Sequence, residues 1–208
     1  MVEQRDLGRL AAAAGRERRV VSVLFPFTYR IDGLLRWRAV EAMGVAAGRV
    51  ADQDPEFVRG VLRRLMWSLS DESGSIGWSA PEAIGEILAN RPDLFGDYAP
   101  LLVSLFENLE ESYFHAGILW AIGRVAAKSP DLVADACQPA LAFLGNPRPQ
   151  VRGLAAWCLG RLGCPGVAEP LLALRADHDE LEMYQDGDLQ RVTVGHLARE
   201  AVAALHSA

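Results

Sequence analysis

Tryptophan and glutamate recur at matching positions of this sequence, where they could bind a ligand by ring stacking and charge. Five segments, LRWRAVEAMG, IGWSAPEAIG, FHAGILWAIG, VRGLAAWCLG and VGHLAREAVA, can be laid over one another to give two columns one helical turn apart. The first column holds Trp37, Trp78, Ala116, Gly153 and His196, and the second holds Glu41, Glu82, Trp120, Trp157 and Glu200. Aromatic rings beside carboxylates can hold a cationic peptide, an arginine-bearing helix or a flat ligand. We add His115, from the third segment, to these candidate binding residues.

The same columns have a purely structural interpretation. Helically spaced aromatic residues usually belong to the core, and indole rings fill space between neighbouring helices where small residues face them. Trp67 lies outside the columns and is expected in the core. Both interpretations of the columns stay open, and solvent exposure of the indoles distinguishes them.

No complete catalytic set can be recognised in the sequence. The four histidines are scattered, and no His-Glu dipeptide of the kind that HEAT-repeat di-iron hydroxylases repeat is present. His196 and Glu200 are four residues apart and could share a proton, but two ligands do not make a metal site, and such a pair is ordinary on a helix surface. We therefore predict no catalytic residues, no cofactor and no metal, and leave enzyme activity undecided.

The columns belong to an internal repeat that predicts the fold. Four segments close with Gly44, Gly85, Gly123 and Gly160, which are 41, 38 and 37 residues apart. A period near 40 residues is typical of stacked helical hairpins. Apolar A helices are expected at 18–25, 57–69, 98–109, 132–144 and 167–174, each followed by one of the aligned B helices. The sequence predicts an all-α fold, an α-α superhelix of about five hairpins forming one domain over residues 1–208.

Local signals mark where these elements begin and how they pack. Prolines 55, 92 and 130 lie near helix starts, where the missing N–H costs least, and Pro81 falls in the first turn of its B helix. Asp186-Gly187 predicts a β-hairpin with a type I′ turn at roughly 181–192, with Thr193 capping the final helix. The packed face of the B helices is expected to hold Leu35, Ala39, Ala42, Met43, Ile76, Ala80, Ala83, Ile84, Phe114, Ile118, Ala121, Ile122, Val151, Ala155, Cys158 and Leu159.

The period, the A/B hairpins and the small-x-x-small-apolar-Gly pattern resemble HEAT-like repeats of the kind named after phycobilisome lyases. More narrowly, LLRWRAVEAMG, SDESGSIGWSAPEAIGEI and DGDLQRVTVGHLAREA resemble a small, functionally uncharacterised bacterial group of such proteins. In these solenoids the B helices line the concave side, so the resemblance implies that both columns face the groove where partners bind. A repeat of this kind specifies architecture rather than activity.

Two hypotheses of function follow. The leading one is a non-enzymatic scaffold that binds a protein or peptide partner on the concave surface. The alternative is a ligand-handling enzyme or chaperone, similar to the bilin lyases, with Trp37, Trp78, Trp120 and Trp157 around a planar molecule. Indoles buried between helices would leave only the general scaffold.

Charge is distributed unevenly along the chain, whose net charge is −6. Residues 1–65 hold 12 arginines and 8 acidic residues, whereas the remainder holds 9 basic and 19 acidic residues. The acidic remainder argues against nucleic acid and favours a basic partner. Acidic residues of the turns are expected to stack into a ridge formed by Asp71, Glu72, Glu107, Glu110 and Glu111, continued by acids of the last turn. Ordinary solvated turns are the alternative.

The N-terminus and the cysteines bear on location. Glu3 and Asp6 stand where a signal peptide would be basic, and no apolar run approaches the ~18 residues that span a bilayer. Three cysteines without a CxxC pair indicate neither a disulfide framework nor a zinc site, and Cys158 is expected in the core. We predict a cytoplasmic protein that makes no membrane contact.

Overall fold

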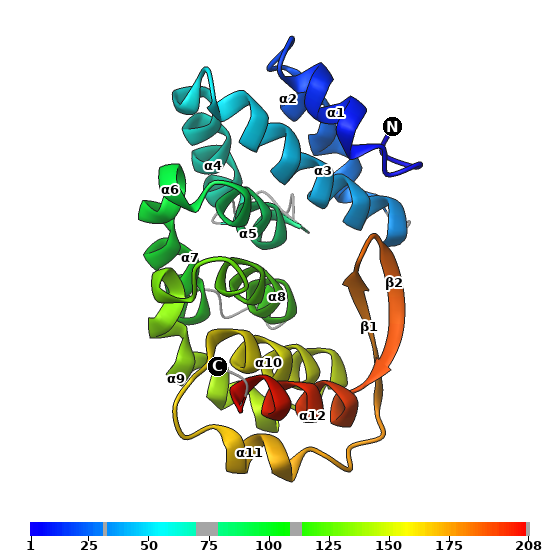
Figure 1. The fold of residues 1–208 in the computed structure, drawn as a ribbon, viewed down its shortest axis with the longest axis vertical. Helices are drawn as coiled ribbons and strands as arrows, with labels where there is room; N and C mark the ends of the chain where they lie inside the picture. The colour runs from blue at the N-terminus through cyan, green and yellow to red at the C-terminus, as the bar shows by residue number, and fades with distance from the viewer. Residues whose placement is uncertain (31–32, 70–78, 109–113, 207–208) are drawn as a thin grey trace.

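The structure is a computed structural model and describes residues 1–30, 33–69, 79–108 and 114–206. Its inner helices follow one another down the stack, each packed beside the next (Figure 1). These B helices are α3 (Gly33–Ala51), α5 (Ala80–Asn90), α8 (Phe114–Ala126), α10 (Pro149–Leu162) and α12 (Val194–Leu205). The predicted α-α superhelix is confirmed.

Shorter helices and 3₁₀ turns form the outer layer, and α1 lies against the first B helix. In chain order, α1 and the elements of the outer layer are α1 (Leu7–Ala14), α2 (Val20–Leu24), η1 (Phe25–Tyr29), α4 (Pro55–Leu69), α6 (Pro92–Phe95), η2 (Gly96–Tyr98), α7 (Ala99–Asn108), η3 (Pro130–Ala136), α9 (Cys137–Ala142), η4 (Phe143–Gly145) and α11 (Ala168–Ala173). Proline begins α4, α6 and η3, and Pro81 is the second residue of α5, as the sequence predicts. Pro149, which was not predicted, begins α10.

The packed face predicted for the B helices is buried. Every predicted position within the described ranges is at most 9% exposed, and Ile76 lies outside them. The prediction that Trp67 belongs to the core is wrong, because its side chain is 67% exposed. The buried positions of α4 follow a helical stripe that includes Leu62, Leu65 and Leu69, and Trp67 falls on the opposite face of that amphipathic helix.

The repeated glycines mark the contacts between neighbouring B helices. A Cβ added to Gly85 would lie 2.6 Å from Cα of Ala121, and one added to Gly160 would lie 2.6 Å from Cα of Ala201. At Gly123 the space is taken by the ring of Trp157. The period of the sequence therefore records where the backbones of stacked helices approach most closely.

A β-hairpin precedes the last helix, as predicted. Strands β1 (Glu180–Gln185) and β2 (Asp188–Thr193) pair antiparallel. Asp186 and Gly187 have φ of 53° and 91°, which matches a type I′ turn. Thr193 accepts a hydrogen bond from the backbone N–H of His196 and caps α12. The hairpin runs along the concave side from α12 to α3 (Figure 1).

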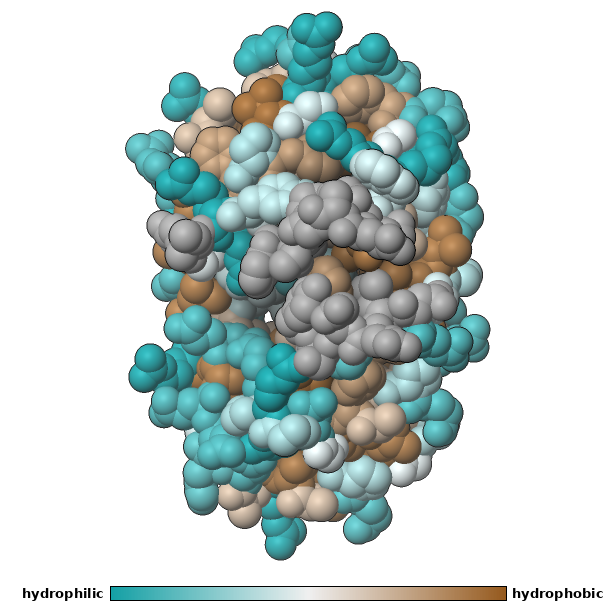
Figure 2. Space-filling model, turned by 180° about the vertical axis from the view of Figure 1, so that it is seen from behind, coloured by the Kyte–Doolittle hydropathy of each residue, from teal (hydrophilic) through white to brown (hydrophobic). Residues whose placement is uncertain are grey.

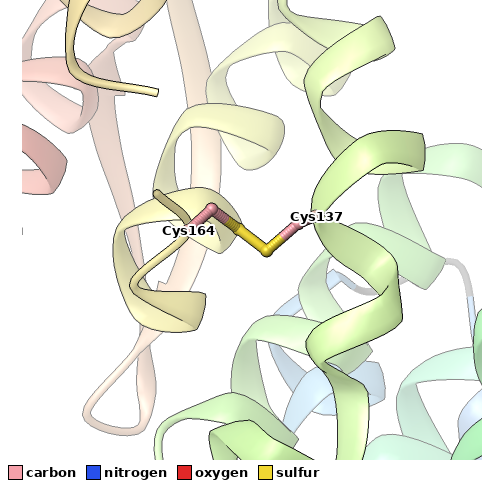
Figure 3. The surroundings of a disulfide bond; sticks show 2 residues. All are labelled: Cys137 and Cys164. Carbon is pink, nitrogen blue, oxygen red and sulfur yellow. A yellow bond between two sulfur atoms is a disulfide. The ribbon is translucent and has the colours of Figure 1, made fainter. Parts of the chain in front are cut away.

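A disulfide joins Cys137 and Cys164, which corrects the prediction that the cysteines form none (Figure 3). The fold places the start of α9 beside the turn after α10, although 27 residues separate the two cysteines in sequence. Closing a loop of this length contributes on the order of 3 kcal/mol to stability. Cys158 is buried, as predicted, and burial raises the pKa of its thiol.

Hydrophilic residues project at both ends of the face opposite to that of Figure 1, with hydrophobic residues scattered among the described residues between them (Figure 2). Within the described ranges, no helix combines the length and the apolar character needed to cross a bilayer.

The close approach of the B helices predicts unequal effects of two glycine substitutions. Gly85→Ala should lower the free energy of unfolding by roughly 2 kcal/mol, because the new methyl group meets the backbone of α8. Gly60→Ala, in α4, meets only the far end of the Arg63 side chain, at 3.9 Å, and should stabilise the protein by up to about 1 kcal/mol through helix propensity. Urea denaturation of both variants checks this, and equal effects would contradict the assigned contact.

Candidate functional site

The concave side holds the chain's own hairpin, and Tyr184 on β1 is its main point of contact. The Tyr184 ring stacks on Trp37 with 5.4 Å between centroids and 5° between planes. Its hydroxyl donates to Glu41 at 2.7 Å, and its carbonyl accepts a hydrogen bond from Nε1 of Trp120 at 3.4 Å. We call these four residues the Tyr184 cluster. It joins α3, α8 and the hairpin through side-chain chemistry that the two columns supply.

A second contact consists of hydrogen bonds to the backbone of β1. The Gln150 amide, at the start of α10, donates to the carbonyl of Glu182 at 2.8 Å and accepts from its N–H at 3.3 Å. One carboxamide thus satisfies both backbone groups of one residue, as a neighbouring strand would. At the tip of the hairpin, Nε of Arg38 donates to the carbonyl of Gly187 at 3.1 Å.

Glu41 is fully engaged within the protein. Arg5 donates to both of its carboxylate oxygens, at 2.8 and 2.7 Å, in addition to the Tyr184 hydroxyl. Burial alone would raise the pKa of Glu41, but the hydrogen bonds from Arg5 and Tyr184 outweigh it and the pKa is lowered. Glu41 is therefore an ionised carboxylate that holds the N-terminal segment and the hairpin against α3.

The first of two pockets beside the hairpin, the Arg124 pocket, has a volume of about 360 Å³ and is lined by charged residues. Arg124 donates to Glu86 at 2.7 Å, and Glu86 is only 2% exposed. Burial raises the pKa of Glu86 against the opposing effect of Arg124. Arg161 lies over the ring of Trp157, 5.7 Å from its centroid. The buried carboxylate of this pocket, Glu86, is thus paired with a cation, Arg124.

The second pocket, the Glu82 pocket, has a volume of about 270 Å³ and lies between the hairpin and the inner helices. Glu82 is 6% exposed, and among the described residues its Oε2 has no hydrogen-bond partner. The carboxylate lies over Gly117, where an added Cβ would be 2.8 Å from it. Burial raises the pKa of Glu82 to about 7, opposed by a hydrogen bond to its own backbone and by the charge of Arg36.

The four tryptophans of the two columns differ in exposure. Trp120 and Trp157 are 2% and 8% exposed, packed between B helices and against the hairpin. Trp37 is half-buried beneath Tyr184, and Trp78 lies outside the described residues. Trp120 and Trp157 are therefore largely buried, and both line the Arg124 pocket.

The predicted histidines and the last glutamate lie away from both pockets. The ring of His115 packs against Phe143 of the outer layer, with 4.6 Å between centroids. His196 and Glu200 form an exposed pair, 3.4 Å apart, on α12.

Most of the predicted acidic ridge falls outside the described residues, namely Asp71, Glu72, Glu110 and Glu111. Glu107 is exposed near the end of α7. In the last turn, Arg152 donates to Asp177 at 2.7 Å and to Asp179 at 2.5 Å. The hydrogen bond from Arg152 lowers the pKa of Asp177. Both acids pair with Arg152 within the protein, Asp177 with its side chain largely buried and Asp179 with its side chain largely exposed.

Three residues that matter here were not singled out from the sequence: Tyr184, Gln150 and Arg5. Tyr184 lies in a strand that the sequence predicts, but nothing local indicates where the hairpin packs. Gln150 and Arg5 act through contacts that span 32 and 36 residues of sequence.

Comparison with known proteins supports the repeat architecture. Residues 113–162 match the family model of the HEAT-like repeat. An uncharacterised protein of Archaeoglobus fulgidus is 28% identical over 183 residues, which cover 86% of this chain and 93% of that protein.

Solved structures with the same fold are similar along nearly the whole chain. An engineered protein has a TM-score of 0.59 at 18% identity, over 98% of this chain and 88% of its own. A designed armadillo repeat protein has a TM-score of 0.52 at 18% identity, over 99% of this chain and 98% of its own. These likenesses show the helical repeat fold alone, a fold whose concave surfaces commonly serve protein–protein interaction.

The raised pKa of Glu82 predicts a pH-dependent stability. Between about pH 4.5 and 7 the folded protein keeps the Glu82 proton that the unfolded chain loses, so stability falls as pH rises through this window. Relative to Glu82→Gln, the wild type should lose roughly 3 kcal/mol of unfolding free energy across it. Denaturant titrations at several pH values measure the difference. The exposed-site control Glu169→Gln should follow the wild type, and a Glu82→Gln profile parallel to both would contradict the assignment.

Proposed function

We propose that this protein is a non-enzymatic interaction module that holds a polypeptide partner in its concave groove. The observation that carries the proposal is that the groove already holds an extended segment, the chain's own hairpin. Gln150 pairs with the backbone of Glu182, and the Tyr184 cluster holds a side chain by stacking and a hydrogen bond. Backbone pairing combined with pockets for side chains is how proteins bind extended peptides.

The partner segment runs beside the hairpin and places side chains in the Arg124 and Glu82 pockets. Their volumes, about 360 and 270 Å³, suit individual side chains. The unpartnered Glu82 carboxylate favours a basic side chain in the second of them. The proposed groove thus keeps Trp37, Glu41 and Glu82 among its residues. Glu41 contributes by holding the hairpin in place.

The alternative function is the handling of a planar molecule. A flat ligand needs open indole faces, and the burial of Trp120 and Trp157 weighs against it.

The finer assignments belong to the same proposal. We propose that residues 1–208 act as one domain, that its repeats are of the phycobilisome-lyase type, and that the protein is cytoplasmic. The Cys137–Cys164 disulfide counts against the cytoplasmic location, because disulfides are rare in cytosolic proteins. Alkylation of thiols in intact native cells decides between the two: labelled, reduced cysteines would support the cytoplasmic location, and protected cysteines would contradict it.

Site-specific photo-crosslinking tests the proposed function. A photoreactive amino acid replaces Arg161, which is exposed at the Arg124 pocket, in the native cell. The matched control carries it at Glu56, exposed on α4 of the outer layer. We expect one polypeptide to be crosslinked from the groove position only, and the crosslinked segment, once synthesised, to bind the purified protein. Equal products from both positions, or none from the groove, would contradict the proposal.

A further inference from the structure

Glu82 differs from the other buried or half-buried carboxylates of the B helices, Glu41 and Glu86. Glu41 accepts hydrogen bonds from Arg5 and Tyr184, and Glu86 accepts them from Arg124. Oε2 of Glu82 accepts none from the described residues, although it is buried. A buried carboxylate oxygen without a partner is costly, so proteins rarely retain one without a use for it.

Among the described residues, Arg36 is the cation that lines the pocket. Its Nη1 lies 3.3 Å from Oγ of Ser79, and its guanidinium lies over the Trp37 ring. The charge of Arg36 lowers the pKa of Glu82, but burial raises that pKa by more. The Glu82 side chain thus lines the pocket, and among the described residues its Oε2 has no hydrogen-bond partner.

The walls of that space define the chemistry of an occupant. Trp37, Leu154 and Leu189 supply apolar surface, and Ala116 and Gly117 add small residues to the wall, with the carboxylate packed over Gly117. Apolar walls with one carboxylate at the base suit a group with an aliphatic stem and a cationic head. One unpartnered oxygen suits the compact donor of an ammonium group better than the two parallel bonds of a guanidinium.

We infer that the Glu82 pocket is a binding site for an alkylammonium group, as carried by a lysine side chain, with the Glu82 carboxylate as the acceptor. The ammonium head replaces the missing cation, and the stem packs between Trp37 and Leu189. Only the statement that the lysine belongs to a polypeptide partner rests on the proposed function. Recognition of the ammonium group is a property of the pocket itself.

Binding should depend on pH through Glu82. Among the described residues, the charged groups at the pocket are Arg36 from α3 and Glu182 from β1, whereas α8, α10 and β2 present uncharged residues to it. An ammonium group stays protonated up to about pH 10. Because the pKa of Glu82 is raised to about 7, its ionised fraction grows roughly tenfold from pH 6 to pH 8. Affinity for the amine should grow by a similar factor.

Titration of the full chain with Nα-acetyl-lysine amide tests the inference, with Nα-acetyl-norleucine amide as the uncharged probe of similar shape. NMR signals of Gly117 and Leu189 report occupancy. We expect saturable shifts with the lysine probe only, about tenfold weaker at pH 6 than at pH 8. Glu82→Gln, which keeps the shape of the side chain, should weaken binding at least tenfold and abolish its pH dependence. Equal binding of both probes, unchanged affinity in Glu82→Gln, or no saturable binding would overturn the inference.

A second pair of variants keeps the test independent of the stability of Glu82→Gln. Ala116→Leu fills the Glu82 pocket and should abolish binding of the lysine probe, whereas Ala127→Leu makes the same change in the Arg124 pocket and should leave it intact. Binding that survives Ala116→Leu would place the amine elsewhere and overturn the inference. Binding of the probe without any crosslinked polypeptide would leave the inference standing and remove the proposed function. A crosslinked partner without probe binding would do the reverse.

Discussion

The contact between Tyr184 and the inner helices determines the shape of the concave side. A two-stranded hairpin alone is at best marginally stable in water, so β1 and β2 depend on the groove that holds them. In turn the hairpin covers Trp120, stacks on Trp37 and forms one wall of each pocket. Without this contact the groove would be an open, tryptophan-lined surface. With it, the groove is two small pockets on either side of a strand.

Charge on the inner helices follows a common rule with one exception. Glutamates that face the groove are largely withdrawn from water, and such a position is stable only where a cation or several hydrogen bonds compensate. Arg5 and Tyr184 do so for Glu41, and Arg124 does so for Glu86. Glu82 has the burial without the cation, which is why the pocket beside it is the place where a ligand group would change the energetics most.

The sequence predicts what depends on local period and misses what depends on distant packing. The spacing of Gly44, Gly85, Gly123 and Gly160 predicts the stack because each glycine lies where two B helices touch. Asp186-Gly187 predicts the hairpin because its type I′ turn needs positive φ at both residues.

Contacts across the fold were not predictable in the same way. The position of the hairpin depends on Gln150 and Tyr184, whose partners lie 32 to 143 residues away. The disulfide joins two turns that no cysteine motif relates. In the candidate site, the columns contained Glu82 and Trp37, but the sequence could not show that Trp120 and Trp157 are buried, because that depends on packing across the fold, including the contact of Trp120 with β1.

Hydrogen–deuterium exchange of the hairpin tests the central claim, that the groove holds its own β1 and β2, most directly. In the wild type, the peptide that spans residues 180–193 should exchange as slowly as the buried segments of α8 and α10. Tyr184→Ala should accelerate exchange of that peptide by orders of magnitude while the B helices stay protected, because only the contacts to the groove are lost. Exchange of the wild-type hairpin within seconds, or equal protection in the variant, would contradict this account.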